Sequence, residues 1–167
     1  MSQGGTYSVK EIANWILDYA DQVGVPVSSM ALNKLVYFAY EHALTQYGRK
    51  LTEAKIEAWD HGPVFREVYS SFKQFDAEAI TDRAKKYNTR TDSVETVHPD
   101  LASDDEEIII DAIASMIRLP AFILREISHD ARGPWAKVWN HTGSSNPGME
   151  ITDDLILSSL PTSRLSR

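Results

Sequence analysis

The sequence predicts a mainly α-helical protein, built as a single compact domain with a small β element (a short strand or hairpin) between its helices. Three observations predict this class. Apolar residues recur at helical spacing in several segments, capping residues stand before them, and only short stretches alternate between polar and apolar residues. The chain has 167 residues, 43% of them hydrophobic, which is enough for one core. We expect the domain over residues 8–160, between flexible ends at 1–7 and 161–167.

Two long helices are predicted near the N-terminus. The first covers residues 9–23, because Ser8 and Glu11 have the spacing of a capping box and a glycine follows the last turn. The second covers residues 29–47. Its apolar residues, including Tyr37, surround nearly the whole helix, which is typical of a central helix. We interpret its aromatic side chains as core, with a cofactor-binding or base-stacking face as the alternative.

A short strand and a sharp corner are predicted next. Residues 55–59 alternate between polar and apolar side chains, as a half-buried strand does. Gly62 and Pro63 then interrupt the chain, and Pro63 suits the first position of a third helix. The apolar residues expected on the buried face of that helix are Val64, Phe65, Val68, Tyr69 and Phe72.

The C-terminal half contains a weakly patterned stretch and then shorter helices. Residues 74–102 are interpreted as an exposed, variable excursion, with a second short strand at Thr91–Val97. The basic run at Arg83, Lys85, Lys86 and Arg90 is interpreted as a solvated surface, with contact to RNA or DNA as the alternative. The helices expected after it are 103–117 (opened by a capping box at Ser103 and Glu106), 120–128, 134–139 and 155–160, with a loop at 142–148.

The composition excludes several classes of function. The chain has no cysteine, so thiolate nucleophiles, disulfides and cysteine-type zinc sites are absent. Its formal net charge of -7 makes it a poor general DNA binder, because affinity for DNA depends on neutralising phosphates. We see no signal peptide and no apolar stretch long enough to cross a membrane, and we therefore expect a cytoplasmic protein without membrane contact.

Two short clusters contain residue types that occur in catalytic sites. Asp60 and His61 are adjacent, but neighbours in an extended chain point to opposite faces, so they do not form a dyad by themselves. Ser128-His129-Asp130 has the three residue types of a hydrolase triad, yet triads are assembled from distant positions. The five histidines lack the spacing of a metal site, and we expect no metal and no cofactor.

The chain resembles the Panacea, or SocA-like, antitoxin domain family over roughly residues 8–160. Residues 30–39 are similar to that family's Leu-Gln-Lys-Leu-Leu-Tyr-Tyr-Ala helix, and residues 51–59 to its strand. Residues 61–69 are similar to its Tyr-Gly-Pro-Val and Val-Tyr motif, and residues 124–135 to its Leu-Ser-His and Pro-Trp motif. Asn33 and His61 depart from the family pattern. The matching positions interpreted as structural are Lys34, Tyr37, Gly62, Pro63, Val64, Tyr69, His129 and Pro134.

The resemblance implies an antitoxin of a type II-like toxin–antitoxin pair, without enzymatic activity, that binds and neutralises a protein toxin. Some family members act as adaptors that deliver the toxin to a Clp-type AAA+ protease, and others are described only as phage-associated. We expect the partner surface to combine the corner with part of residues 74–102. The residues expected in that surface are Trp59, Asp60, His61, Phe65, Arg66 and Trp135. The alternative is a small-ligand binder or hydrolase that uses His61 and His129.

Overall fold

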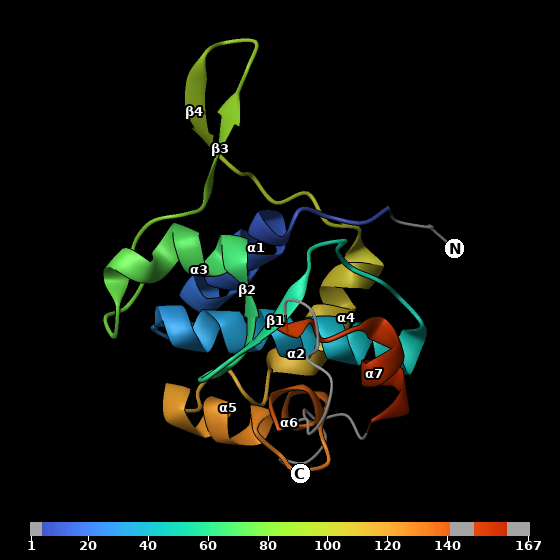
Figure 1. The fold of residues 1–167 in the computed structure, drawn as a ribbon. Coiled ribbons are helices and arrows are strands. Elements are labelled where there is room, and N and C mark those ends of the chain that lie inside the picture. The colour runs from blue at the N-terminus through green and yellow to red at the C-terminus, as the bar shows by residue number, and fades with distance from the viewer. Residues whose placement is uncertain (1–4, 141–148, 160–167) are drawn as a thin grey trace.

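A computed structural model describes residues 5–140 and 149–159, and these residues form a helical body with two small hairpins (Figure 1). The helices are α1 (Val9–Val23), α2 (Ser29–Tyr47), α3 (Arg66–Phe72), α4 (Ser103–Ile113), α5 (Ala121–Ser128), α6 (Pro134–Trp139) and α7 (Asp153–Ser158), with a short 3-10 turn at Lys73–Phe75. The strands are β1 (Ile56–Trp59), β2 (Gly62–Phe65), β3 (Lys85–Asn88) and β4 (Ser93–Thr96). The predicted mainly α class with small β elements is confirmed.

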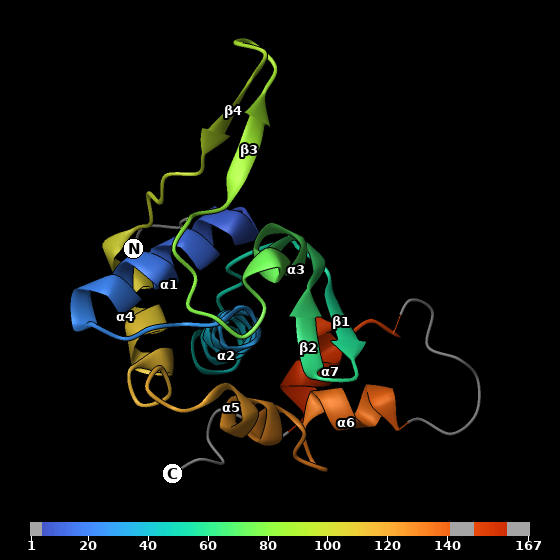
Figure 2. The same cartoon turned by 90° about the vertical axis from the view of Figure 1, so that its left-hand side faces the viewer.

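Helix α2 is the centre of the fold. Seen nearly along its axis, it is surrounded by α1, α4, α5 and the hairpin of β1 and β2 (Figure 2). Every residue from Ala31 to Leu44 is buried, including Tyr37, whose hydroxyl donates to Glu41 at 2.7 Å. The predicted bounds of this helix are correct. Tyr37, Phe38 and Tyr40 are core residues as expected, whereas Tyr47 in the last turn is exposed.

The helix ends follow the sequence only in part. Ser8 caps α1 by accepting from the Lys10 amide, but the Glu11 carboxylate accepts from the Asp100 amide instead of closing a capping box. Helix α4 is preceded by Ala102, so Ser103 is its first residue and not its cap, and the helix ends at Ile113 instead of residue 117. The two capping boxes fail for the same reason, since the acidic side chains of both bond to distant segments. Glu106, for example, accepts from the Trp15 indole.

The last helix and the chain ends also differ from the expectation. Helix α7 spans Asp153–Ser158, two residues earlier than expected, because Thr152 caps it by accepting from the Leu155 amide. The expected loop at 142–148 and the tail at 161–167 lie outside the described residues. Before α1, the Tyr7 hydroxyl donates to Asp105 at 2.6 Å, which ties this segment to α4.

The inner hairpin, β1 with β2, replaces the helix start that was predicted at Pro63. Its strands are antiparallel with Trp59 opposite Gly62, so Asp60 and His61 form the turn. Pro63 therefore lies in a strand, and α3 begins three residues later at Arg66. The reason is tertiary: the Pro63 carbonyl accepts from Lys34 on α2, and the Phe65 amide donates to Asn33 on α2. Local sequence spacing does not reveal that the backbone groups of this strand form hydrogen bonds with side chains of a distant helix.

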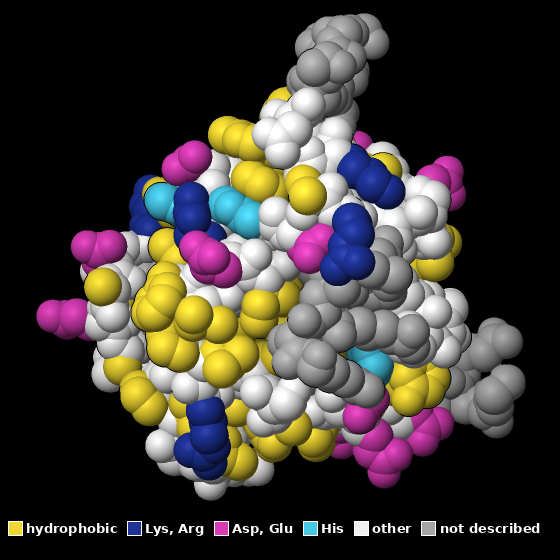
Figure 3. All heavy atoms as spheres, turned by 90° about the horizontal axis from the view of Figure 1, so that it is seen from below, with side chains coloured by type: hydrophobic (Ala, Val, Ile, Leu, Met, Phe, Trp, Pro, Cys, Tyr) yellow, Lys and Arg dark blue, Asp and Glu magenta, His cyan; other side chains and the backbone are white. Residues whose placement is uncertain are grey.

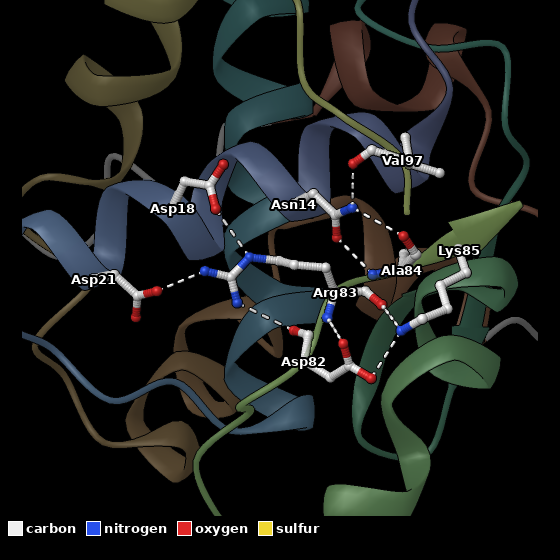
Figure 4. A network of polar contacts seen from close by, with 8 residues as sticks. All are labelled: Asn14, Asp18, Asp21, Asp82, Arg83, Ala84, Lys85 and Val97. Carbon is white, nitrogen blue, oxygen red and sulfur yellow. Dashed lines mark hydrogen bonds and ion pairs between the residues drawn. The ribbon is translucent and has the colours of Figure 1, made fainter. Parts of the chain in front are cut away.

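The outer hairpin, β3 with β4, projects from the body at the top of Figure 1. Its base is fixed to α1 by the network in Figure 4, in which the buried Asn14 amide bonds to Ala84 and Val97. Arg83 forms ion pairs with Asp18 and Asp21 of α1. One member of the predicted basic run is thus a structural anchor and is already neutralised. A search of residues 5–140 and 149–159 finds no helix long and apolar enough to span a membrane.

Candidate functional site

The candidate site is the turn of the inner hairpin and the surface around it. The turn lies against α5 and α6, at the lower end of the molecule in Figure 2. Strand β2 is buried at each of its residues, and α2 holds its free edge through Asn33 and Lys34. Because the backbone beneath the turn is fixed by hydrogen bonds at both edges, the side chains around it are held in defined positions.

Three side chains of the residue types that dominate protein interfaces meet beside this turn. The Trp59 and Tyr69 rings contact edge to face with centroids 4.9 Å apart, and the Arg66 guanidinium lies 5.9 Å from the centroid of the Trp59 ring. Arg66 also donates twice to Glu57, at 2.9 Å each. We call Trp59, Arg66 and Tyr69 the aromatic–arginine patch.

The ion pair between Arg66 and Glu57 keeps both side chains charged and holds them in place beside the patch. The hydrogen bonds from Arg66 hold the pKa of the Glu57 carboxyl below its ordinary value, so Glu57 is ionised at neutral pH. The fork geometry of a bidentate pair restricts the arginine to one orientation. One face of the guanidinium is thereby kept over the Trp59 ring.

Asp60 and His61 occupy the turn itself and are well exposed. Their side chains are 73% and 60% exposed, and the nearest polar atoms of the pair are 3.8 Å apart, beyond hydrogen-bond distance. The His61 Nδ1 atom accepts a hydrogen bond of 3.1 Å from Arg125 on α5. An Nδ1 atom that accepts cannot carry a proton, so this contact assigns the neutral tautomer with its proton on Nε2. Both residues can therefore offer polar groups to a partner.

Trp135 and His129 lie behind the turn instead of beside it. The Trp135 indole is buried and donates to the Trp59 carbonyl at 2.8 Å, so it supports the end of β1 from below. His129 stacks on Trp135 with ring centroids 3.6 Å apart, and within the described residues its buried Nε2 atom has no hydrogen-bond partner. Burial, followed by the positive charges of Arg125 and Lys34, lowers the pKa of His129 to about 4. His129 is therefore neutral at physiological pH.

The triad interpretation of Ser128, His129 and Asp130 has no matching geometry. The Ser128 hydroxyl donates to the Arg125 carbonyl at 2.7 Å, an ordinary contact within a helix, and Asp130 bonds to Arg132. Among the residues that the structure describes, no group of three histidine or carboxylate side chains could hold a metal ion. The region thus offers a binding surface more readily than a reacting pair.

Lys34 and Gly62 are packed unusually tightly beneath the turn. Gly62 has a φ of 114°, and a Cβ atom placed on it would lie 2.6 Å from the Ser128 hydroxyl and 2.7 Å from Cε of Lys34. Only glycine allows this approach. The Lys34 side chain is 1% exposed, and burial lowers the pKa of its amine to about 7, with a further contribution from Arg125.

A cavity of about 480 Å³ opens between this lysine and the turn. Its walls come from α2, the inner hairpin, α3 and the segment after it. The lining residues are Ser28, Ser29, Met30, Asn33, Lys34, Trp59, Asp60, His61, Val64, Tyr69, Lys73, Asp76, Ala77 and Ala121. From below, this end of the molecule shows histidine side chains next to basic ones, beside a broad hydrophobic area (Figure 3).

The structure divides the residues expected in the partner surface into two groups. Asp60, His61 and Arg66 are exposed and Trp59 is half-buried, whereas Phe65 and Trp135 are buried beneath them. Tyr69, which was expected to be structural, is 40% exposed and belongs to the patch. Of the other positions expected to be structural, His129 is half-buried, and the rest are buried: Lys34, Tyr37, Gly62, Pro63, Val64 and Pro134.

Sequence reasoning missed the contributions of Glu57 and Arg125. Glu57 orients Arg66, and Arg125 bonds to His61 from a helix that follows 64 positions later. The spacing of Glu57 and Arg66 on either side of a two-residue turn could have indicated a cross-strand pair. No local pattern points to Arg125.

Comparisons with known proteins agree with these features. The profile of the family described as "Antitoxin SocA-like, Panacea domain" matches residues 32–136, from the central helix to the end of the Pro-Trp motif. "Antitoxin SocA" of Caulobacter vibrioides (strain NA1000 / CB15N) is 34% identical over 148 residues, which cover 88% of this chain and 79% of that protein. No solved structure matches the chain. The chain belongs to the family of SocA-like antitoxins with a Panacea domain.

Proposed function

We propose that this protein is an antitoxin that neutralises a cognate protein toxin by binding it directly, without catalysis. The observation that carries the proposal is the aromatic–arginine patch, which is exposed and yet held rigidly by the Glu57 ion pair and the inner hairpin. Tryptophan, tyrosine and arginine are the residue types most enriched among the few residues that dominate binding energy in protein interfaces. A surface that is already ordered loses little entropy when a partner binds.

The remaining residues of the proposed interface have two distinct tasks. Asp60 and His61 form its polar rim, where exposed charges influence specificity more than affinity. Phe65 and Trp135 act from beneath, since both are buried and Trp135 bonds to the backbone of Trp59. The outer hairpin is a second candidate contact region, because Tyr87 and Val94 face each other across its strands and are exposed.

The proposal is tested by co-expression with the protein encoded beside this gene. The neighbour alone should arrest growth, and this protein should restore it. Trp59→Ala, Arg66→Ala and Tyr69→Ala should each weaken the purified complex roughly 10- to 100-fold, as expected for residues at the centre of an interface. Tyr47→Ala is the matched control, because Tyr47 is also an exposed aromatic residue and lies at the far end of α2. Thermal melts of each variant separate lost binding from lost folding.

Two outcomes would contradict the proposal. Either the neighbouring protein is harmless, or rescue and affinity are unchanged in all three patch variants although they fold normally. Tyr87→Ala adds a further distinction. If it weakens binding as much as the patch variants do, the outer hairpin belongs to the same interface.

A proteolytic adaptor role and a cytoplasmic location are part of the same proposal. An adaptor delivers its toxin to a Clp-type protease, so the toxin should disappear in the presence of this protein, the protease and ATP. Simple neutralisation should leave the toxin intact within a stable complex. A pulse-chase measurement of toxin lifetime in cells with and without the protease distinguishes the two.

A further inference from the structure

The amine of Lys34 has an electrostatic environment that the fold does not explain. Within the described residues, its hydrogen bond goes to the Pro63 carbonyl at 3.0 Å, and no carboxylate is paired with it. Arg125, the charged group that acts on it, has the same sign. A buried ammonium ordinarily needs an anionic partner. A methionine of similar length would fill the same space without this cost.

The cavity beside Lys34 has the walls of a ligand site. Lys34 lines it together with the apolar or aromatic side chains of Met30, Trp59, Val64 and Tyr69. Its volume of about 480 Å³ lies within the range of small-molecule pockets. A single buried cation within mainly apolar walls selects a ligand with one negative charge on an apolar stem.

We propose that this cavity binds a carboxylate carried on an aromatic or aliphatic stem, with Lys34 as its counter-ion. The stem packs against the surface that Trp59 and Tyr69 present to the cavity, and the carboxylate meets the Lys34 amine. Binding draws a proton onto the amine, since a neighbouring anion favours the charged form of lysine.

The other charged groups around the cavity favour a carboxylate over a phosphate. Asp60 and Asp76 lie on the wall and repel a doubly charged anion, whereas Lys73 on the same wall partly offsets a single charge. His61, also on the wall, is held by Arg125 in the tautomer whose Nε2 atom carries the proton. A carboxylate needs one positive charge and one or two donors, which this wall supplies.

The site can be probed without knowledge of the natural ligand. The probe is 3-phenylpropanoate, and its neutral amide is the matched control. With lysine labelled at the ε carbon with ¹³C, the resonance of Lys34 should shift towards the ammonium position when the acid is added at pH 8, and not with the amide. The affinity for the acid should fall about 25-fold between pH 6.5 and 8.5, because the amine, whose pKa is lowered to about 7 in the unliganded protein, loses its proton over this range while the bound amine keeps it.

Lys34→Met is the variant that tests the counter-ion. It should abolish the preference for the acid over the amide while the amide binds as before. The proposal is overturned if neither compound perturbs Lys34, if both perturb it equally, or if the folded variant keeps the preference. The resonance of Lys34 in the unmodified protein decides the question even if the variant does not fold.

A further pair of probes identifies the source of the carboxylate. The peptide acetyl-Gly-Gly-Phe has the same spacing between ring and carboxylate as 3-phenylpropanoate, and its C-terminal amide is the control. Tighter binding of the peptide acid than of the small acid assigns the site to the end of a protein chain. Equal affinity assigns it to a small organic acid. The proposal does not depend on toxin binding. A failed test of carboxylate binding would therefore leave the antitoxin function untouched, and the reverse also holds.

Discussion

The two hairpins have strands of the same length and the same antiparallel pairing, yet the inner one is packed into the core and the outer one projects from it. The inner hairpin packs on α2, and each residue of β2 is buried. The outer hairpin is exposed along most of its length. Among the described contacts it is attached near its base, through Asn14 and Arg83 (Figure 4) and through Lys10, which donates to the Lys85 carbonyl. The contrast shows that strand pairing alone does not determine what a hairpin contributes to stability. That contribution depends on the contacts between the hairpin and the helices.

The largest expected difference is between Phe65 in the inner hairpin and Tyr87 in the outer one. Phe65 is completely buried, and its ring packs edge to face with that of Tyr40, with the two centroids 6.1 Å apart. Phe65→Ala should therefore reduce the free energy of unfolding by about 4 kcal/mol. Tyr87 is exposed, and Tyr87→Ala should change it by less than about 0.5 kcal/mol. Urea denaturation of both variants makes the comparison. Equal losses would show that the outer hairpin is part of the cooperative core.

The next effect concerns the glycine that begins β2. Gly62→Ala should cost about 3 kcal/mol, because the new methyl group is strained at a φ of 114° and collides with Ser128 and Lys34. Gly24→Ala is the control, since Gly24 also has a positive φ of 71° but faces open space. It should cost only about 1 kcal/mol. The same loss in both variants would mean that the close approach beneath the turn does not matter.

The attachment of the outer hairpin should contribute less. Asn14→Ala removes the side chain that accepts from the Ala84 amide and donates to the Val97 carbonyl. We expect a loss of about 2 kcal/mol, limited because the released hairpin can be hydrated. Amide exchange should accelerate in β3 and β4 and stay unchanged in β1 and β2. Asn88→Ala, which removes a half-buried contact with Glu95 in the same hairpin, is the control and should leave exchange near Ala84 unaltered.

Local sequence patterns located α1, α2 and the strands β1 and β4, but they missed β2 and β3 and misplaced the start of α3 and the end of α4. The bounds of α2 and the cap of α1 follow from spacing and from single capping residues, which act within one or two turns. Pro63 was misassigned to a helix because its conformation depends on Lys34, which is 29 positions earlier in the chain. A single sequence does not reveal contacts of this kind, which join elements that are far apart in the chain.

The candidate site could be located from sequence but not resolved into its parts. The Trp-Asp-His-Gly-Pro stretch indicated a corner at Gly62 and Pro63, whereas the exposed turn is formed by the two residues before them, Asp60 and His61. Whether each aromatic residue faces solvent was not predictable. Trp59 and Trp135 both stand next to turns, but the indole of Trp135 points inward to the Trp59 carbonyl and the Tyr69 ring reaches the surface. Burial of Lys34 was likewise hidden within an ordinary helical pattern.

The smallest expected change is also opposite in sign, and it concerns the buried lysine that holds the inner hairpin. Lys34→Met should stabilise the protein at pH 7 by about 1–2 kcal/mol, because it removes a desolvated amine and loses only one hydrogen bond to a carbonyl. Gain of stability in this variant, together with loss of carboxylate binding, would show that Lys34 serves binding at the expense of folding. A loss of stability would instead show that the hydrogen bond from Lys34 to the Pro63 carbonyl outweighs the cost of burying the amine.

The pH dependence of that gain identifies its cause. The folded-state pKa of Lys34, about 7, lies below the ordinary value of 10.5, so between these pH values the unfolded chain binds more protons than the folded one. Stability must then rise with pH across this window, by up to about 1.4 kcal/mol per unit, and the full penalty applies below pH 7. The advantage of Lys34→Met should therefore shrink as the pH is raised from 7 to 9. A constant advantage over this range, measured by urea denaturation of both proteins, would mean that packing and not desolvation of the amine sets the difference.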